Sequence, residues 1–184
     1  MNLKQTHTPA IASGAAALDT ITYAIAQSTI GKILAARGSL GVCAILIGSD
    51  AEALAQDLAS RFPGRMLVED ETALKDDLAA ITRFIETPAA GLELPLDISH
   101  GTPFQQRVWE RLRAIPCGVT ITYTALAQRL GQSNGARAVA TACAANAIAL
   151  GIPCHRVVRA DGTPSGYRWG TERKRALLDR EIAI

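Results

Sequence analysis

The feature that most constrains the fold is an interruption near the middle of the chain. Between positions 88 and 101 the sequence contains four glycines or prolines, namely Pro88, Gly91, Pro95 and Gly101. Because these residues end helices and strands, the stretch separates two parts of different character. Short apolar runs alternate with turn residues before it, and helical spacing dominates after it. We therefore expect an α/β fold of two packed subdomains, at 19–98 and 99–184, with a flexible leader at 1–18.

The two parts also differ in charge. Positions 1–99 carry seven Lys or Arg and twelve Asp or Glu, whereas positions 100–184 carry twelve and five. Eleven of the twelve basic residues in the second part are arginines, whose planar guanidinium can donate two parallel hydrogen bonds to one phosphate. A solvated surface would account for such charges singly, but their confinement to one part favours a polyanionic partner.

Composition excludes several classes of protein. With 48% hydrophobic and 20% charged residues among 184, the chain is globular rather than disordered. Its apolar runs are too short to span a bilayer, and its first residues lack the pattern of a secretory signal, so we expect a cytoplasmic protein without a membrane partner. The cysteines contain no CxxC pair, which predicts free thiols and no metal; they are Cys43, Cys117, Cys143 and Cys154.

The first part reads as a small sheet with two helices. Three β-leaning runs at 20–27, 30–36 and 41–47 are separated by Gly or Ser and predict an antiparallel meander. Ser49 and Glu52 have the spacing of a capping box, which predicts a helix that ends before Pro63. A short strand at 66–69 and an amphipathic helix at 70–86 complete this part.

The second part reads as mostly helical. Thr102, Pro103 and Gln105 predict a capped helix that ends near 116–118. A short helix at 123–130 is followed, after a turn of about three residues that contains Gly131, by another from 133 or 134 to 145, and this arrangement predicts a helix-turn-helix. A short strand at 157–159 and a last helix at about 171–181 follow.

The second helix of this pair is unusual for one that reads DNA sequence. Its only long polar side chain is Arg137, and most of the rest are Ala, Gly, Thr and Val. It lacks the Asn, Gln and multiple Arg groups that discriminate bases in the major groove. Small side chains instead suit close approach to a narrow groove, with one arginine inserted beside the bases. An Ala-rich core helix with one exposed arginine is the alternative.

Cys154 lies between Pro153 and His155 in the run IPCHRVV. A buried, inert cysteine is the usual state of such a residue. A proline that breaks helices, a neighbouring imidazole and the positive charge of Arg156, which favours a thiolate, all suggest a reactive one. In an extended chain adjacent side chains point in opposite directions, so His155 would need a bridging water to reach the sulfur. That geometry disfavours a cysteine hydrolase, whose base contacts its nucleophile.

Five segments resemble the O6-alkylguanine-DNA alkyltransferase family in order and spacing. They are GTPFQQRVWERLRAIPCG at 101–118, TITYTALA at 120–127, ARAVATACAAN at 136–146, IPCHRVV at 152–158 and SGYRWGTERKRALLDRE at 165–181. The first part resembles the ribonuclease-H-like half of these proteins, most particularly the alkyltransferase part of bacterial Ada regulators. The resemblance covers about residues 20–182.

This resemblance implies DNA repair by direct reversal. Cys154 would accept the alkyl group from a flipped O6-alkylguanine, irreversibly and once per molecule, as a methylated-DNA–protein-cysteine S-methyltransferase. His155 would act as base through a water, Glu181 would orient His155, and Asn146 would hydrogen-bond within the active-site turn. Tyr123 would donate a hydrogen bond to the departing guanine.

The resemblance also implies a set of binding residues. Arg137 would fill the space left by the flipped nucleotide, within a DNA-binding set of Tyr123, Asn134, Arg137, Ala138 and Thr141. The guanine pocket would be lined by Pro153, Val157, Tyr167, Arg168 and Trp169. We expect a monomer without a cofactor, whose partner is duplex DNA carrying O6-alkylguanine or O4-alkylthymine. The alternatives are a helix-turn-helix module that binds alkylated DNA without reacting, a cysteine hydrolase and a sequence-specific repressor.

Overall fold

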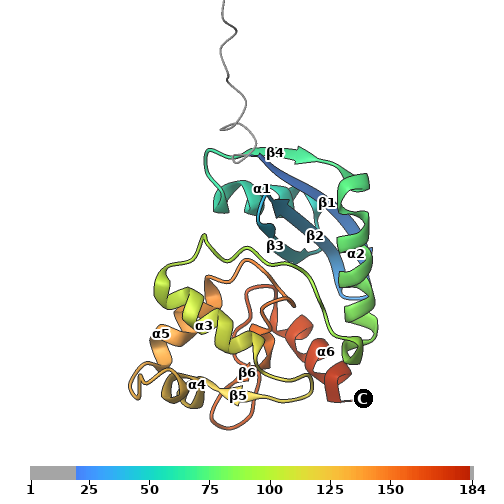
Figure 1. Cartoon of the computed structure of the whole chain (residues 1–184). Coiled ribbons are helices and arrows are strands. Elements are labelled where there is room, and N and C mark those ends of the chain that lie inside the picture. Colours follow the sequence, from blue (N-terminus) through green and yellow to red (C-terminus); the bar gives the residue numbers. More distant parts are fainter. Residues whose placement is uncertain (1–19, 183–184) are drawn as a thin grey trace, which may run out of the picture.

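A four-stranded sheet forms the first half of the molecule (Figure 1). The computed structural model describes residues 20–182, and the leader expected at 1–18 lies outside them. The strands are β1 (Thr20–Ser28), β2 (Gly31–Gly38), β3 (Gly41–Gly48) and β4 (Met66–Glu69), in the order β3-β2-β1-β4. The first three are antiparallel, which confirms the predicted meander, and β4 runs parallel to β1.

Two helices pack against this sheet, α1 (Ala51–Arg61) and α2 (Glu71–Glu86). The predicted Ser49–Glu52 capping box is wrong: Asp50 caps α1, and its carboxylate accepts a hydrogen bond from the Glu52 amide at 2.9 Å. A carboxylate at this position also interacts favourably with the helix dipole, which explains why it takes the cap one residue later.

The second half is mostly helical. Its helices are α3 (Pro103–Arg113), α4 (Tyr123–Arg129), α5 (Ala136–Ala144) and α6 (Thr171–Ile182), with the 3-10 turns η2 (Pro88–Ala90) and η3 (Cys154–Arg156). Thr102 and Gln105 form the predicted capping box of α3. Two short parallel strands, β5 (Ile121–Thr122) and β6 (Val157–Val158), pair beside α4; β5 was not expected, and β6 is shorter than the predicted strand at 157–159.

Helices α4 and α5 form the predicted helix-turn-helix, but their connection is longer than expected. Helix α5 begins at Ala136, with Gly135 as its N-cap. It therefore starts later than Ser133 or Asn134, where we expected it to begin. Gly131 has a φ of 71°, a left-handed conformation that a side chain disfavours, and it reverses the chain after α4. The turn therefore spans six residues, 130–135.

The edge of the sheet at β3 is covered by two segments of the chain. The amide of Val42 donates to Pro95 O at 2.8 Å, and the amide of Asp97 donates to Val42 O at 2.9 Å. Further along β3, Ile45 exchanges two backbone hydrogen bonds with Ala147 and Ala149, each of 2.9 Å. The segment after α5 thus continues the sheet, and the buried side chains of both halves form one hydrophobic core.

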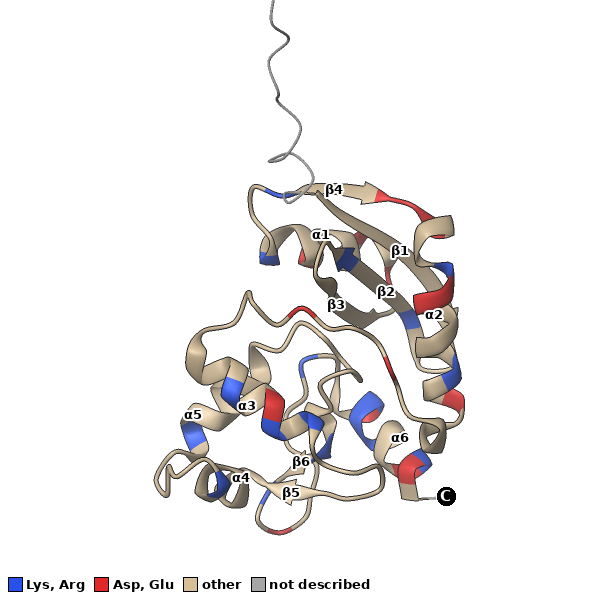
Figure 2. Ribbon diagram, viewed as in Figure 1, with Lys and Arg blue, Asp and Glu red and all other residues tan. Residues whose placement is uncertain are grey.

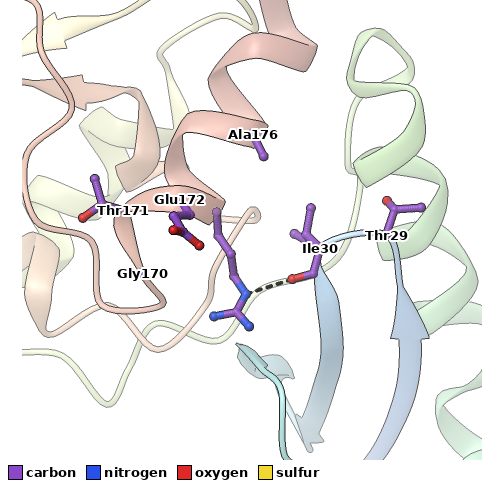
Figure 3. A pocket seen from close by; sticks show the side chains of 7 residues that line it. Thr29, Ile30, Gly170, Thr171, Glu172 and Ala176 are labelled. Atoms are coloured by element: carbon purple, nitrogen blue, oxygen red, sulfur yellow. Dashed lines mark hydrogen bonds between the residues drawn. The ribbon is translucent and has the colours of Figure 1, made fainter.

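Helix α6 is attached to the sheet by two arginines. The Arg173 guanidinium, which lines a cavity of about 630 Å³, donates to Ile30 O in the β1–β2 turn at 2.8 Å (Figure 3). It also donates to Trp169 O at 2.8 Å. Arg180 donates to Thr29 Oγ1 at 3.0 Å and to Ile85 O at the end of α2 at 3.2 Å. The position of α6 in the second half is therefore fixed by the first half.

Among the described helices, none has the length and apolar character that a bilayer crossing requires.

Candidate active site

The Cys154 thiol lies in a turn beside the helix-turn-helix. Residues Cys154–Arg156 form η3 directly after Pro153, so the extended conformation that we expected for this run is wrong. Proline lacks an amide hydrogen and suits the residue before a short helical turn, so it starts η3 rather than preventing it. Cys154 is 5% exposed, which leaves its sulfur nearly covered.

Asn146 holds this turn in place. Its side-chain amide donates to Ile152 O at 2.9 Å and to the Cys154 sulfur at 3.3 Å. Its carbonyl oxygen accepts from the Ile148 amide at 2.8 Å. Asn146 is fully buried and uses both ends of its side chain, so it fixes the segment from α5 to the sulfur as well as contacting the sulfur itself.

Behind Cys154 lies a buried network of three charged or polar side chains. His155 Nε2 is 2.9 Å from Glu181 Oε1, and Glu181 comes from the last turns of α6. Arg156 donates to the same carboxylate from Nε and Nη2, at 2.9 and 2.8 Å, and also to Ile115 O at 2.6 Å. The Gly118 amide donates to Glu181 Oε2 at 3.1 Å. A buried carboxylate is tolerated because these donors satisfy it.

The hydrogen bonds assign the tautomer of His155. Burial by itself would raise the pKa of Glu181, but hydrogen bonds from His155 and Arg156 and their charges lower it to about 2, so its carboxylate only accepts. Burial lowers the pKa of the fully buried His155, which favours a neutral ring. His155 therefore donates from Nε2 and keeps a free lone pair on Nδ1. Within the described chain this buried Nδ1 has no hydrogen-bond partner.

The positive charge near the sulfur comes from a residue that the sequence analysis missed. Burial raises the pKa of the Cys154 thiol, while the Asn146 hydrogen bond and the charge of Lys174 lower it. Lys174 on α6 is fully buried, and its ammonium donates to Val157 O at 2.5 Å and to Ser165 Oγ at 3.1 Å. The expectation that Arg156 would favour the thiolate is wrong, because its guanidinium donates hydrogen bonds to the Glu181 carboxylate and to Ile115 O instead.

Ser165 links this lysine to Tyr123. The Tyr123 phenol oxygen lies 2.6 Å from Ser165 Oγ, which also accepts from Lys174. A serine hydroxyl has one hydrogen to donate, so it can donate to the phenol oxygen and leave the phenol hydrogen free. Burial raises the pKa of Tyr123, and the Ser165 hydrogen bond lowers it. Spacing from Cys154 gives no signal for Ser165 or Lys174, since their roles depend on how the 159–170 loop folds back.

The five residues expected to line a guanine pocket differ in how far they are buried. Pro153, Val157 and Trp169 are buried, and Tyr167 is partly buried with its ring 6.5 Å from that of His155 and 5.1 Å from that of Trp169. The Tyr167 hydroxyl and the Trp169 indole nitrogen are buried without a partner among the described residues. The Arg168 side chain is exposed and donates to Asp57 of α1 at 2.8 Å, so only its main chain is available to this pocket.

Four of the five residues expected to contact DNA share the exposed side of α5 and its preceding turn, and the fifth, Tyr123, is half-buried on α4. Asn134, Arg137, Ala138 and Thr141 are all exposed, whereas Val139, Ala142 and Cys143 are buried. The alternative of a core helix is therefore wrong, since α5 has one buried and one open face. Figure 2 shows Lys and Arg on α3, α4 and α5 in the lower part of the molecule, and Asp and Glu at the end of β4 and along α2 in the upper part.

Among residues 20–182, the His, Cys, Asp and Glu side chains form no group of three that is arranged to hold a metal ion.

Comparison with known proteins places the chain in a family. Residues 103–183 match a family described as 6-O-methylguanine DNA methyltransferase, DNA binding domain. The crystal structure of Mycobacterium tuberculosis OGT in complex with DNA superimposes with a TM-score of 0.76 at 32% identity, covering 88% of this chain and 93% of that one. The chain belongs to the O6-methylguanine-DNA methyltransferase family. The mixed α/β class expected from the sequence is confirmed.

The chain covers different shares of its relatives. The inducible methylated-DNA–protein-cysteine methyltransferase of Bacillus subtilis is 40% identical over 121 residues, which are 66% of this chain and 67% of that protein. The bifunctional transcriptional activator/DNA repair enzyme Ada of Escherichia coli is 46% identical over 161 residues, 88% of this chain. That match spans 45% of Ada, so the chain covers less than half the length of this relative.

Proposed function

We propose that this protein repairs DNA by transferring the alkyl group of O6-alkylguanine to its own Cys154. The observation that carries the proposal is the buried Nδ1 of His155, the residue next to Cys154, which has no hydrogen-bond partner among the described residues while Glu181 holds Nε2. A nucleophile, a base and a third group that orients the base are the parts that covalent catalysis requires. Membership of the methyltransferase family supports this assignment.

The transfer begins with a proton. Because burial raises the pKa of Cys154, the closed site holds a thiol, and the attack needs a base. His155 Nδ1 takes the thiol proton through a bridging water, and Glu181 stabilises the imidazolium that forms. Cys154 Sγ then bonds to the alkyl carbon while the bond from that carbon to guanine O6 breaks, and the electron pair stays on the guanine.

As the bond to the alkyl carbon breaks, negative charge develops on the departing guanine. Tyr123 donates a hydrogen bond to it, and Ser165 and Lys174 polarise the phenol from behind. The imidazolium of His155 returns its proton through water, so the guanine leaves neutral. The product at Cys154 is a thioether, which lacks a good leaving group, and each molecule acts once.

The exposed face of α5 supports the proposed mode of DNA binding. Small side chains such as Ala138 and Thr141 allow close approach to the minor groove, and Arg137 is placed to occupy the gap left by the flipped nucleotide. Extrusion costs a few kcal/mol and costs least for a mispaired lesion, which gives selectivity for damage without base-sequence readout. O4-alkylthymine fits the same chemistry as a second substrate.

We also propose the division of labour expected from the sequence, with a supporting part at 19–98 and a reacting part at 99–184. One chain supplies every residue of the site, so a monomer suffices. An acceptor thiol must stay reduced, which supports action in the cytoplasm. Transcriptional activation, a property named for the longer Ada relative, is not part of this proposal.

The test is incubation with duplex DNA that carries O6-methylguanine labelled in the methyl group. We expect at most one label per chain, bound to Cys154, and none for Cys154→Ala. Steady release of a labelled small molecule would instead indicate a cysteine hydrolase, and tight binding without labelling would indicate a non-reacting DNA-binding module. The hydrolase has no specific support here, because within the described residues no hydrogen bond joins His155 to the Cys154 sulfur.

A further inference from the structure

A cleft lined by three arginines lies beside the helix-turn-helix. Arg107, Arg111, Glu110 and Ala114 occupy one side of α3, and Arg129 and Leu130 come from the end of α4. The cleft has a volume of about 490 Å³, and its three arginine side chains are exposed. Neither the catalytic chemistry nor the exposed face of α5 uses it.

These arginines differ from four others in the molecule, which are paired with carboxylates. Arg37, Arg61, Arg156 and Arg168 each form an ion pair. Within residues 20–182, Arg107, Arg111 and Arg129 form none, although Glu110 lines the same cleft. Their one aromatic contact is Arg107 over the Phe104 ring at 5.8 Å. Three unpaired guanidinium groups around one cleft repel each other, and an anion between them would relieve that repulsion.

The position of the cleft is fixed relative to α5. Val108, Trp109 and Leu112 are buried on the other side of α3, and the Trp109 indole donates to Ala142 O of α5 at 2.9 Å. Arg129 stands two residues before Gly131, where the turn toward α5 begins. Figure 2 shows the basic segments of α3, α4 and α5 close together at the lower left of the view, away from the acidic α2. The cleft is therefore continuous with the proposed DNA-binding surface.

We propose that this arginine cleft binds phosphates of the DNA backbone flanking the point where α5 meets the duplex. The inference rests on the proposed function, since it takes the same duplex as its partner. Arginine matches phosphate geometry and carries no base preference in such contacts, so the cleft would hold the protein on any sequence. That property suits damage that can arise at any guanine.

The experiment measures DNA binding in a Cys154→Ser background, in which no transfer takes place. Arg107→Gln, Arg111→Gln and Arg129→Gln are combined, and affinity for an unmodified duplex and for the same duplex with O6-methylguanine is measured over a range of salt concentrations. Each arginine that contacts a phosphate contributes about 0.9 to the slope of log affinity against log salt. We expect a slope shallower by about 2 to 3 and an affinity at least about tenfold weaker at low salt, to the same extent for both duplexes.

A matched variant controls for net charge. Lys32→Gln, Lys75→Gln and Arg83→Gln remove three positive charges from β2 and α2, and we expect the salt slope to stay near that of the parent. Equal losses in the two triple variants, or an unchanged slope in the arginine variant, would overturn the proposal.

A second readout separates this inference from the proposed function. With Cys154 restored, the arginine variant should accept the methyl group from free O6-methylguanine base at the parent rate, because the free base has no phosphate. Loss of that reaction in the arginine variant alone would assign the cleft a structural role and overturn the inference. Absence of the reaction in the parent would count against the proposed function, while the salt slopes would still test the cleft.

Discussion

At the scale of single residues, the proposed chemistry depends on which buried nitrogen keeps a lone pair that can accept a proton. His155 Nε2 is paired with Glu181, and Arg156 and the Gly118 amide hold the carboxylate in place, so Nδ1 is the ring nitrogen left without a partner among the described residues. Lys174 donates a hydrogen bond to Ser165, whose hydroxyl lies within hydrogen-bond distance of the Tyr123 phenol. In the proposed transfer, His155 takes the proton of the thiol and Tyr123 donates a hydrogen bond to the departing guanine.

The state of His155 sets the pH dependence of transfer. Because its pKa lies below the ordinary value of about 6.5, the ring is neutral at and above that pH. We expect the rate of methyl transfer from free O6-methylguanine to be constant between about pH 6.5 and 8 and to fall only below this range. Rapid-quench rates across this range check it, and a fall that begins above about pH 7 would contradict a neutral, buried base.

Glu181 sets part of the acid stability. Its pKa in the folded protein is about 2, below the ordinary value of about 4.3, so its contribution is complete above about pH 4.3 and is lost as the pH falls toward 2. The shift corresponds to about 3 kcal/mol of stability at neutral pH.

The variant Glu181→Gln removes this pH dependence and leaves Arg156 buried without its partner. We expect the free energy of unfolding in urea at pH 7 to fall by about 3 to 5 kcal/mol. Between pH 4.3 and 2 the variant should lose less stability than the parent. Parallel pH profiles of the two proteins would show that these contacts do not lower the pKa of Glu181.

Ser165 is a positioning residue whose role depends on its hydroxyl. Ser165→Ala removes the acceptor of Lys174 and the partner of Tyr123, and we expect transfer to slow by about tenfold, the equivalent of one lost hydrogen bond. Ser165→Thr keeps the hydroxyl and should restore most of the rate. Equal losses in both variants would point to packing rather than to the hydroxyl.

At the scale of elements, α3 supports the end of α5. The last carbonyls of a helix lack partners within it, and the Trp109 indole donates to one of them, Ala142 O. This contact fixes the angle at which α5 presents its exposed face, and Asn146 then directs the chain from α5 to the sulfur.

The variant Trp109→Phe leaves that carbonyl unpaired and a small space in the core. We expect the free energy of unfolding to fall by about 1 to 3 kcal/mol, measured in urea. Because the exposed face of α5 then loses its fixed angle, DNA affinity should fall too, while transfer from free O6-methylguanine should be preserved. A variant as stable as the parent would show that packing rather than the hydrogen bond holds α5.

At the scale of the whole molecule, the sheet half and the helical half are one structure. Ile45 of β3 exchanges hydrogen bonds with the 147–149 segment, and Arg173 and Arg180 attach α6 to the β1–β2 turn and to α2. Glu181 belongs to α6, so His155, the proposed base, is held in place partly by residues of the first half.

We therefore expect a single cooperative unfolding transition. Native-state hydrogen exchange should give the amides of Ile45 and Ala149, which pair across the seam, nearly the same opening free energy, equal to that of global unfolding. If the amides of α3 to α6 opened at a free energy several kcal/mol lower than those of β2 and β3, the halves would be separable.

The sequence by itself determined the local features of this protein. Apolar spacing and turn residues predicted the meander, both sheet helices and the capping box of α3, since these depend on neighbours within a few positions. The motifs around Cys154, Tyr123 and Arg137 indicated the family. The predicted cap of α1 was wrong by one residue, because Ser49 and Asp50 are both good caps and the Asp50 carboxylate also interacts with the helix dipole.

Only the tertiary structure decided which groups of the site form hydrogen bonds with one another. Lys174 and Ser165 reach Tyr123 through the folding of the 159–170 loop, Arg156 turns to Glu181 instead of the sulfur, and Arg168 reaches across to Asp57. These contacts join residues that are from 9 to 111 positions apart. Their partners are chosen by competition for buried hydrogen bonds among all parts of the chain, which no local pattern records.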